Sequence, residues 1–199
     1  SKRVITLFVV EAMLTGNSSI NALSNNFNTK VSVIDLGIDK SSKGNEKINL
    51  DGIINKRLME KGTNNIAKES AMPYEITLKA IEIGIETVDN FCKKGYNLFA
   101  TGEMGIGNTT TSSAILKVYS KLSLDDIVGY GSGIDDKTLQ HKKDIIKKAI
   151  GVNSNKNQKI KISDPVDVIS KVGGLDIAGL VGVYLGCAKN KVPVVIDGF

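Results

Sequence analysis

The strongest constraint on the fold is an apolar stretch that leads through closely spaced glycines into a polar helix start. Residues 96–101 form the apolar stretch, and Gly102, Gly105 and Gly107 precede the Thr/Ser-rich segment 108–113. A strand that enters a helix through glycines leaves backbone N–H groups free at the positive end of the helix dipole. Anions bind at such places, so this loop predicts an α/β protein with a site for a phosphate-bearing ligand.

Apolar periodicity, together with glycine and proline at the boundaries, predicts helices and strands that alternate along the chain. Helices are expected at 4–14, 18–24, 73–94, 108–121, 135–150, 164–173 and 175–188, and strands at 30–36, 96–101 and 192–196. Residues 38–64 lack clear periodicity and are expected to form a long connection, and 123–133 a loop. This order predicts a single α/β domain over 1–199, with residues 1–25 as a candidate helical extension.

Composition narrows the function classes. The formal net charge of +5 comes largely from lysines, which are dense between 142 and 161, but aromatic residues make up only 5% of the chain. Basic clusters without interleaved aromatics favour a solvated helix face over a nucleic-acid site. The absence of a signal-like segment or a long apolar run predicts a cytoplasmic protein without a membrane partner. Cys92 and Cys187 are far apart in sequence, which predicts reduced thiols on packed helices and no metal site.

The glycine loop matches neither the P-loop pattern nor the dinucleotide-binding pattern. A tight structural turn is therefore an alternative to a binding loop. Glu103 lies inside the loop, where a carboxylate would repel a phosphate. Its presence suggests a contact with a ribose hydroxyl, a cationic ring or a water molecule.

Lys142 falls near the centre of the apolar stripe of the helix expected at 135–150. An inward-pointing lysine requires an anionic partner or a cavity, which favours an anion ligand. The alternative is a side chain whose stem packs while its ammonium group reaches water. The neighbouring His141, the only histidine, lies off the stripe and is expected at the surface.

Three acidic residues lie at or just after the ends of expected strands: Asp35, Glu103 and Asp197. Ligands of open α/β sheets lie beyond the carboxyl ends of the strands, so these residues could line one crevice. A local role in a turn explains each of these residues about as well as a shared ligand crevice does. In the helix expected at 175–188, Gly182 and Gly186 are four residues apart and permit close helix packing, either within the chain or between subunits.

Several motifs of the chain resemble those of a known family. Gly-Glu-Met-Gly-Ile-Gly-Asn-Thr-Thr at 102–110 is similar to the defining loop of nicotinate-nucleotide–dimethylbenzimidazole phosphoribosyltransferases, enzymes of cobalamin lower-ligand assembly. Further blocks in the family's order lie at 5–6, 16–21, 62–72, 131–136, 164–165, 171–178 and 192–199.

The resemblance implies a cofactor-independent pentosyltransferase with a Rossmann-like, doubly wound, mostly parallel sheet and flanking helices. Its reaction would transfer phosphoribose from nicotinate mononucleotide to 5,6-dimethylbenzimidazole or a related base, giving nicotinate and α-ribazole phosphate. It also implies a homodimer whose partners are these small molecules. The implied substrate- and phosphate-binding residues are Glu103, Met104, Gly105, Ile106, Gly107, Asn108, Thr109, Lys142, Gly173, Gly174 and Asp197.

Two family motifs do not occur in this sequence: a Gly-Glu-Gly-Thr-Gly-like segment whose glutamate is the general base, and an Asp-His-Gly-Val-like segment. The chain is therefore expected to be the large, nucleotide-binding part of a longer enzyme, without the assigned base and with negligible turnover. Glu103 would be an auxiliary carboxylate. The alternative function is a non-catalytic nucleotide-binding or sensing domain, and a nucleic-acid binder is a weaker third. The motifs leave open which azole or purine is the acceptor.

Overall fold

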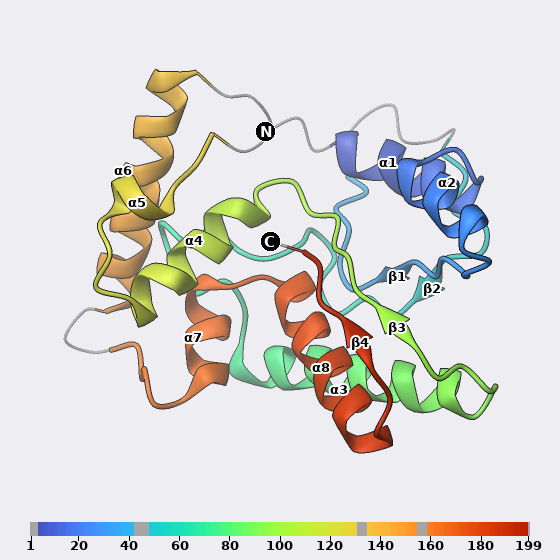
Figure 1. Ribbon diagram of the computed structural model, residues 1–199. Helices are drawn as coiled ribbons and strands as arrows, with labels where there is room; N and C mark the ends of the chain where they lie inside the picture. The colour runs from blue at the N-terminus through green and yellow to red at the C-terminus, as the bar shows by residue number, and fades with distance from the viewer. Residues whose placement is uncertain (1–3, 42–47, 131–134, 155–158, 199) are drawn as a thin grey trace. The chain divides into compact units, whose positions relative to one another are not determined.

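A computed structural model describes residues 4–41, 48–130, 135–154 and 159–198. Within them the chain divides into two compact units. The first comprises Ser1–Gly62 and Met104–Ile106, and the second Thr63–Glu103 and Gly107–Phe199. Figure 1 shows the elements of each unit in order of sequence.

The first unit contains two helices and one pair of short strands. α1 (Val4–Leu14) is apolar and buries Leu7 and Val10, while Phe8 is exposed. α2 (Ser19–Asn26) begins after Ser18, whose backbone N–H donates to Asn21 Oδ1 at 3.2 Å. β1 (Ile34–Asp35) and β2 (Ile54–Asn55) pair in parallel. β2 lies inside the connection expected at 38–64, and two residues are too few to show the alternation that reveals a strand.

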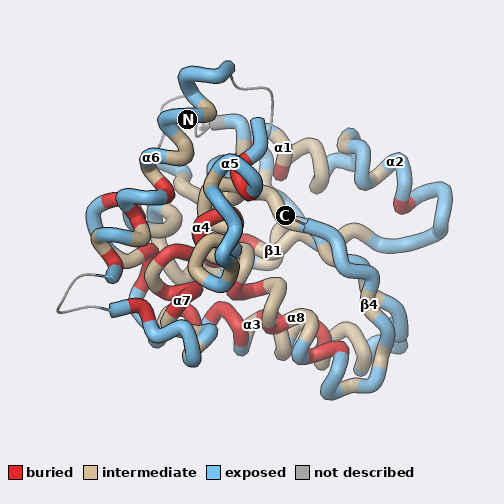
Figure 2. Tube along the Cα trace, turned by 60° about the vertical axis from the view of Figure 1, so that its left-hand side comes forward, coloured by how far each residue is buried: buried red, intermediate tan, exposed pale blue. Residues whose placement is uncertain are grey.

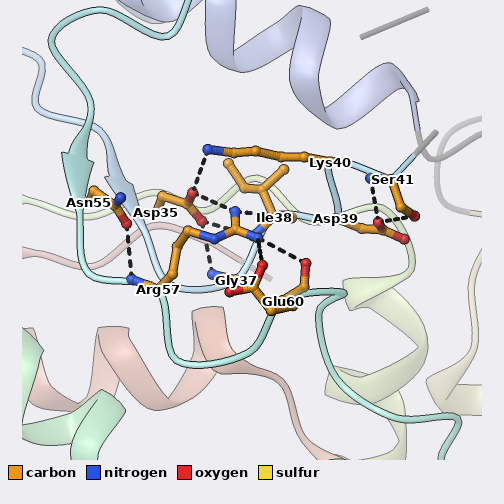
Figure 3. A network of polar contacts seen from close by, with 9 residues as sticks. All are labelled: Asp35, Gly37, Ile38, Asp39, Lys40, Ser41, Asn55, Arg57 and Glu60. Carbon is orange, nitrogen blue, oxygen red and sulfur yellow. Dashed lines mark hydrogen bonds and ion pairs between the residues drawn. The ribbon is translucent and has the colours of Figure 1, made fainter. Parts of the chain in front are cut away.

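A buried carboxylate holds the turn after β1 (Figure 3). Asp35 is fully buried, and its Oδ1 accepts the N–H groups of Gly37 at 2.9 Å and Ile38 at 2.8 Å. Its Oδ2 accepts from Arg57 Nη1 at 2.9 Å and lies 3.5 Å from Lys40 Nζ. Both carboxylate oxygens are therefore occupied within the first unit, which favours turn chemistry over ligand binding for Asp35.

The second unit is organised around two helices that run side by side in the same direction (Figure 1). These helices are α3 (Tyr74–Cys92) and α8 (Leu175–Asn190). Asp89 of α3 accepts hydrogen bonds from two residues of α8, Lys189 Nζ at 2.7 Å and Asn190 Nδ2 at 2.6 Å. A Cβ on Gly182 would overlap the Ile81 carbonyl, and one on Gly186 would lie 2.9 Å from Val88 Cβ. The spacing of glycines in α8 thus serves packing within the chain.

The second unit also contains a short parallel strand pair, β3 (Phe99–Ala100) and β4 (Val194–Val195). Thr101 follows β3 and joins the two strand ends, because its Oγ1 donates to the Asp197 carbonyl at 2.8 Å. The described strands form two separate two-stranded parallel sheets. The expectation of one doubly wound sheet is therefore not met within these residues, where strand pairing is confined to two residues in each strand.

Four helices complete the second unit: α4 (Asn108–Tyr119), α5 (Leu124–Ile127), α6 (Asp136–Asn153) and α7 (Pro165–Val172). They share a buried core (Figure 2), formed by Ala114, Ile127, Val128, Ile146, Ile160, Val168 and Val172. Side-chain caps fix the starts of α5, α6 and α7. The sequence predicted α5 as a loop, because a single turn carries no helical period.

Cys92 and Cys187 are free thiols on α3 and α8. In the described parts of the chain, no helix combines the length and apolar character needed to cross a bilayer.

Replacing Gly182 by alanine is expected to destabilise the second unit. The added methyl group would enter the space of the Ile81 carbonyl, and overpacking of this kind costs about 1–3 kcal/mol. Gly151→Ala in α6 is the control, because no atom lies within 4 Å of the added methyl, and it should stabilise by about 0.5–1 kcal/mol. Urea unfolding of both variants measures the difference, and equal midpoints would contradict the packing argument.

Replacing Asp35 by asparagine is expected to destabilise the first unit. The change leaves the Arg57 guanidinium without its buried partner, and breaking a buried ion pair costs about 3–5 kcal/mol. Asp51→Asn, at an exposed turn, is the control and should stay within about 0.5 kcal/mol. Thermal unfolding distinguishes them, and an unchanged melting temperature for Asp35→Asn would rule out the structural role.

Candidate functional site

The start of α4 lacks a side-chain cap and has an unusual backbone conformation. Gly107 occupies the N-cap position with φ of +100°, a backbone conformation that side-chain-bearing residues rarely adopt. Since no side chain caps this helix, its first N–H groups are available to an external acceptor. A methyl group on Gly107 would meet nothing within 4 Å, so the glycine serves the backbone turn rather than close packing.

Lys142 reaches from α6 to this helix start. Its Nζ donates to Thr109 Oγ1 at 2.8 Å and to the Gly129 carbonyl at 3.4 Å. None of the ion pairs found in the described parts of the chain includes Lys142. Burial lowers the pKa of Lys142, because the surroundings disfavour its charged form. A partly desolvated ammonium beside a threonine hydroxyl is compatible with the anion ligand that the sequence predicts for Lys142, which stays a prediction.

The junction of α7 and α8 brings a second helix start to the same region. Gly173 and Gly174 are both buried, and a Cβ on Gly174 would touch Asp176 Oδ1 and lie 3.7 Å from Thr111 Oγ1 in α4. α8 therefore begins beside the first turn of α4. Packing requires a glycine at position 173, since a Cβ there would lie 2.6 Å from the Ile169 carbonyl oxygen.

Glu103 and Asp197 follow β3 and β4. Gly198 has φ of +117°, and a Cβ there would lie 3.4 Å from Glu103 Cγ. The Asp197 backbone N–H donates to Thr101 Oγ1 at 3.0 Å, at an exposed position. The ends of two adjacent parallel strands thus carry one carboxylate each, the arrangement expected beyond the carboxyl edge of a sheet.

Asp176, which the sequence analysis did not single out as a site residue, is the fourth charged group of this region. Burial raises its pKa above the ordinary value; a hydrogen bond from the Ile177 backbone N–H opposes this shift, and the negative charge of Glu103 adds to it. The sequence carried one signal: an acid in the first turn of a helix that is otherwise apolar and glycine-rich.

The second unit contains most of the predicted site residues and brings some of them into local contact. Lys142 contacts Thr109, Thr111 adjoins Gly174, and Glu103 packs at Gly198. Met104, Gly105 and Ile106 belong to the first unit. Of the family block predicted at 131–136, residues 131–134 lie outside the described part of the chain. Within the parts that the structure describes, no cluster of histidine, cysteine, aspartate and glutamate could hold a metal ion.

Comparison with known proteins places this geometry in context. A family model described as phosphoribosyltransferase matches residues 1–199. A relative from Clostridium tetani, named nicotinate-nucleotide–dimethylbenzimidazole phosphoribosyltransferase, is 45% identical over 194 residues, which are 98% of this chain and 50% of the relative. A relative of the same name from Clostridium acetobutylicum is 43% identical over 195 residues, 98% of this chain and 52% of the relative.

Solved structures agree with these matches. A crystal structure of CobT from Thermus thermophilus superposes with a TM-score of 0.85 at 26% identity, covering 100% of this chain and 56% of that one. The chain spans about half the length of the curated relatives it matches. Since the family model, the named relatives and the fold agree, the chain belongs to the nicotinate-nucleotide–dimethylbenzimidazole phosphoribosyltransferase family.

Proposed function

We propose that residues 1–199 are the large, nucleotide-binding part of a longer phosphoribosyltransferase. It transfers phosphoribose from nicotinate mononucleotide to 5,6-dimethylbenzimidazole or a related base and yields nicotinate and α-ribazole phosphate. The observation that carries this proposal is the contact of the Lys142 ammonium with Thr109 at the uncapped start of α4. A helix start and a lysine together bind the phosphate of a mononucleotide without a metal ion.

The same site contains groups that suit the sugar and ring of the nucleotide. The phosphate would lie against Lys142 and the first N–H groups of α4. The ribose and its positively charged ring would extend toward the carboxylate of Glu103. As the bond between ribose and nicotinate breaks, positive charge develops on the ribose, and a nearby carboxylate stabilises it. Glu103 is an auxiliary group in this proposal, and no described residue is assigned as the base that deprotonates the attacking azole.

The wider features follow from family membership and the parallel strand pair. β3 and β4 would be neighbouring strands of a larger Rossmann-like parallel sheet, whose carboxyl edge carries Glu103 and Asp197. The longer enzyme would be a cytoplasmic homodimer that acts on small molecules. The parallel pairing of Phe99 with Val194 supports this arrangement, because parallel strands are normally part of extended, covered sheets.

Nucleotide binding tests the proposal. Calorimetric titration with nicotinate mononucleotide should give saturable binding, and Lys142→Gln should weaken it about tenfold or more, since a hydrogen bond to a charged group is lost. Lys147→Gln is the matched control, because Lys147 is an exposed lysine of the same helix and should leave the affinity unchanged. Equal weakening by both variants would indicate a diffuse charge effect instead of a phosphate site.

A second measurement separates an enzyme from a sensing domain. The full-length protein that contains this chain should release nicotinate when nicotinate mononucleotide and dimethylbenzimidazole are supplied together. Release should fall with Lys142→Gln. Binding of the nucleotide without any release of nicotinate would favour the non-catalytic alternative.

A further inference from the structure

The hydroxyl group of Thr101 joins the ends of β3 and β4 and has no role in the proposed mechanism. Thr101 directly follows β3, and its backbone N–H donates to the Val195 carbonyl at 3.1 Å. The strand pairing ends there, since it covers only two residues in each strand. Beyond it the side chain connects the strands: Thr101 Oγ1 donates to the Asp197 carbonyl at 2.8 Å and accepts from the Asp197 N–H at 3.0 Å. One side chain therefore holds the segment after β4 against the end of β3.

A third contact links the same hydroxyl to α8. Thr101 Oγ1 lies 3.1 Å from the hydroxyl oxygen of Tyr184. A threonine hydroxyl has one proton to donate and two lone pairs with which to accept. Its proton goes to the Asp197 carbonyl, which is nearer than the Val195 carbonyl at 3.4 Å. Tyr184 is therefore the donor in its contact with Thr101, and the hydrogen-bonding capacity of the Thr101 hydroxyl is fully used.

The segment that Thr101 holds lies against Glu103. Gly198 belongs to this segment, and a Cβ on it would lie 3.4 Å from Glu103 Cγ and 3.4 Å from Leu180 Cδ1 of α8. The Glu103 side chain therefore packs beside the Gly198 backbone. Gly102, between Thr101 and Glu103, adds no such restraint, since a Cβ there would meet nothing within 4 Å. The place of the Glu103 carboxylate thus depends on the segment after β4, and through that segment on Thr101.

We propose that Thr101 is a positioning residue: its hydroxyl, anchored on α8 by Tyr184, fixes the ends of β3 and β4 and thereby the place of the Glu103 carboxylate. The task of Glu103 rests on the proposed function, in which it stabilises the positive charge that develops on the ribose. This charge is greatest in the transition state, so a displaced carboxylate lowers the rate more than it lowers the affinity for the nucleotide. Thr101 does not touch the ligand and acts through Glu103.

Steady-state kinetics of the full-length protein that contains this chain test the proposal. Thr101→Val keeps the shape of the side chain and removes the hydroxyl. We expect kcat for nicotinate release to fall about tenfold to a hundredfold, while KM for nicotinate mononucleotide changes by less than about threefold. Thr101→Ser retains a hydroxyl and should recover most of kcat. An increase in KM at unchanged kcat would show that Thr101 serves ground-state binding and would overturn the proposal.

A milder variant tests the anchor on α8. Tyr184→Phe removes only the hydroxyl that donates to Thr101, and kcat should fall about threefold to tenfold, the effect of one lost hydrogen bond. Because both changes break the same hydrogen-bonded unit, the double variant should lose little more activity than Thr101→Val alone. If the two losses multiply instead, the residues act independently, and Tyr184 is not the anchor of Thr101.

Thr87→Val is the matched control for a general loss of stability. Thr87 is half-buried on α3, in the same unit as Thr101, and its hydroxyl donates to the Ile83 carbonyl of its own helix at 2.7 Å. The control thus removes the same chemical group without touching the strand ends, and kcat should stay unchanged. An equal fall in kcat for Thr87→Val and Thr101→Val would mean that activity follows stability, which contradicts a positioning role.

Amide hydrogen exchange of the full-length protein without ligand separates this inference from the proposed function. The Asp197 N–H loses its acceptor in Thr101→Val and should exchange about threefold to tenfold faster, whereas Thr87→Val should leave its exchange unchanged. If the unmodified protein releases no nicotinate, the proposed function fails, and the exchange of Asp197 still decides whether Thr101 holds the strand ends. If nicotinate is released and Thr101→Val has normal kcat, the positioning role is overturned whatever the exchange shows.

Discussion

The close approach of α3 and α8 is the contact on which the second unit depends. Backbone meets backbone at Gly84 and Gly182, so the two helices approach more closely than side chains would allow. The hydrogen bonds from Lys189 and Asn190 to Asp89 fix the same pair at its far end. α8 is thereby set in register with α3, and Gly174, which precedes α8, lies close to Thr111 in the first turn of α4. The packing of α3 against α8 therefore helps to place the start of α8 next to α4.

Electrostatics divides this site into two ends with different demands. At the α4 end, an uncapped helix start and a half-buried lysine favour negative charge. At the start of α8, the buried carboxyl of Asp176 disfavours a further negative charge, and the charge of Glu103 acts in the same direction on its pKa.

The sequence predicted the parts of the fold that depend on local patterns. The helix expected at 4–14 corresponds to α1. The apolar stripe around Lys142 predicts an inward side chain, and the structure shows its ammonium hydrogen-bonded to Thr109, a partner that the sequence did not indicate. The strands were predicted too long, because a two-residue pairing is decided by the partner strand and not by alternation. β2 was missed for the same reason, and α5 because one turn has no period. Asp176, although part of the family block at 171–178, was not among the predicted site residues, because its burial comes from tertiary packing that local patterns do not show.

Asp35 and Asp176 show how identical residues in similar local settings diverge in role. Each lies next to a glycine-containing turn, and each is shielded from water at one or both carboxylate oxygens. Asp35 has every oxygen occupied, by two backbone N–H groups and the Arg57 guanidinium, so its charge is already compensated inside its own unit. Asp176 keeps one oxygen without a partner among the described residues and faces another acid. The charge of Asp35 is therefore compensated by its own unit, whereas burial raises the pKa of Asp176 because no cation or donor reaches its second oxygen among the described residues.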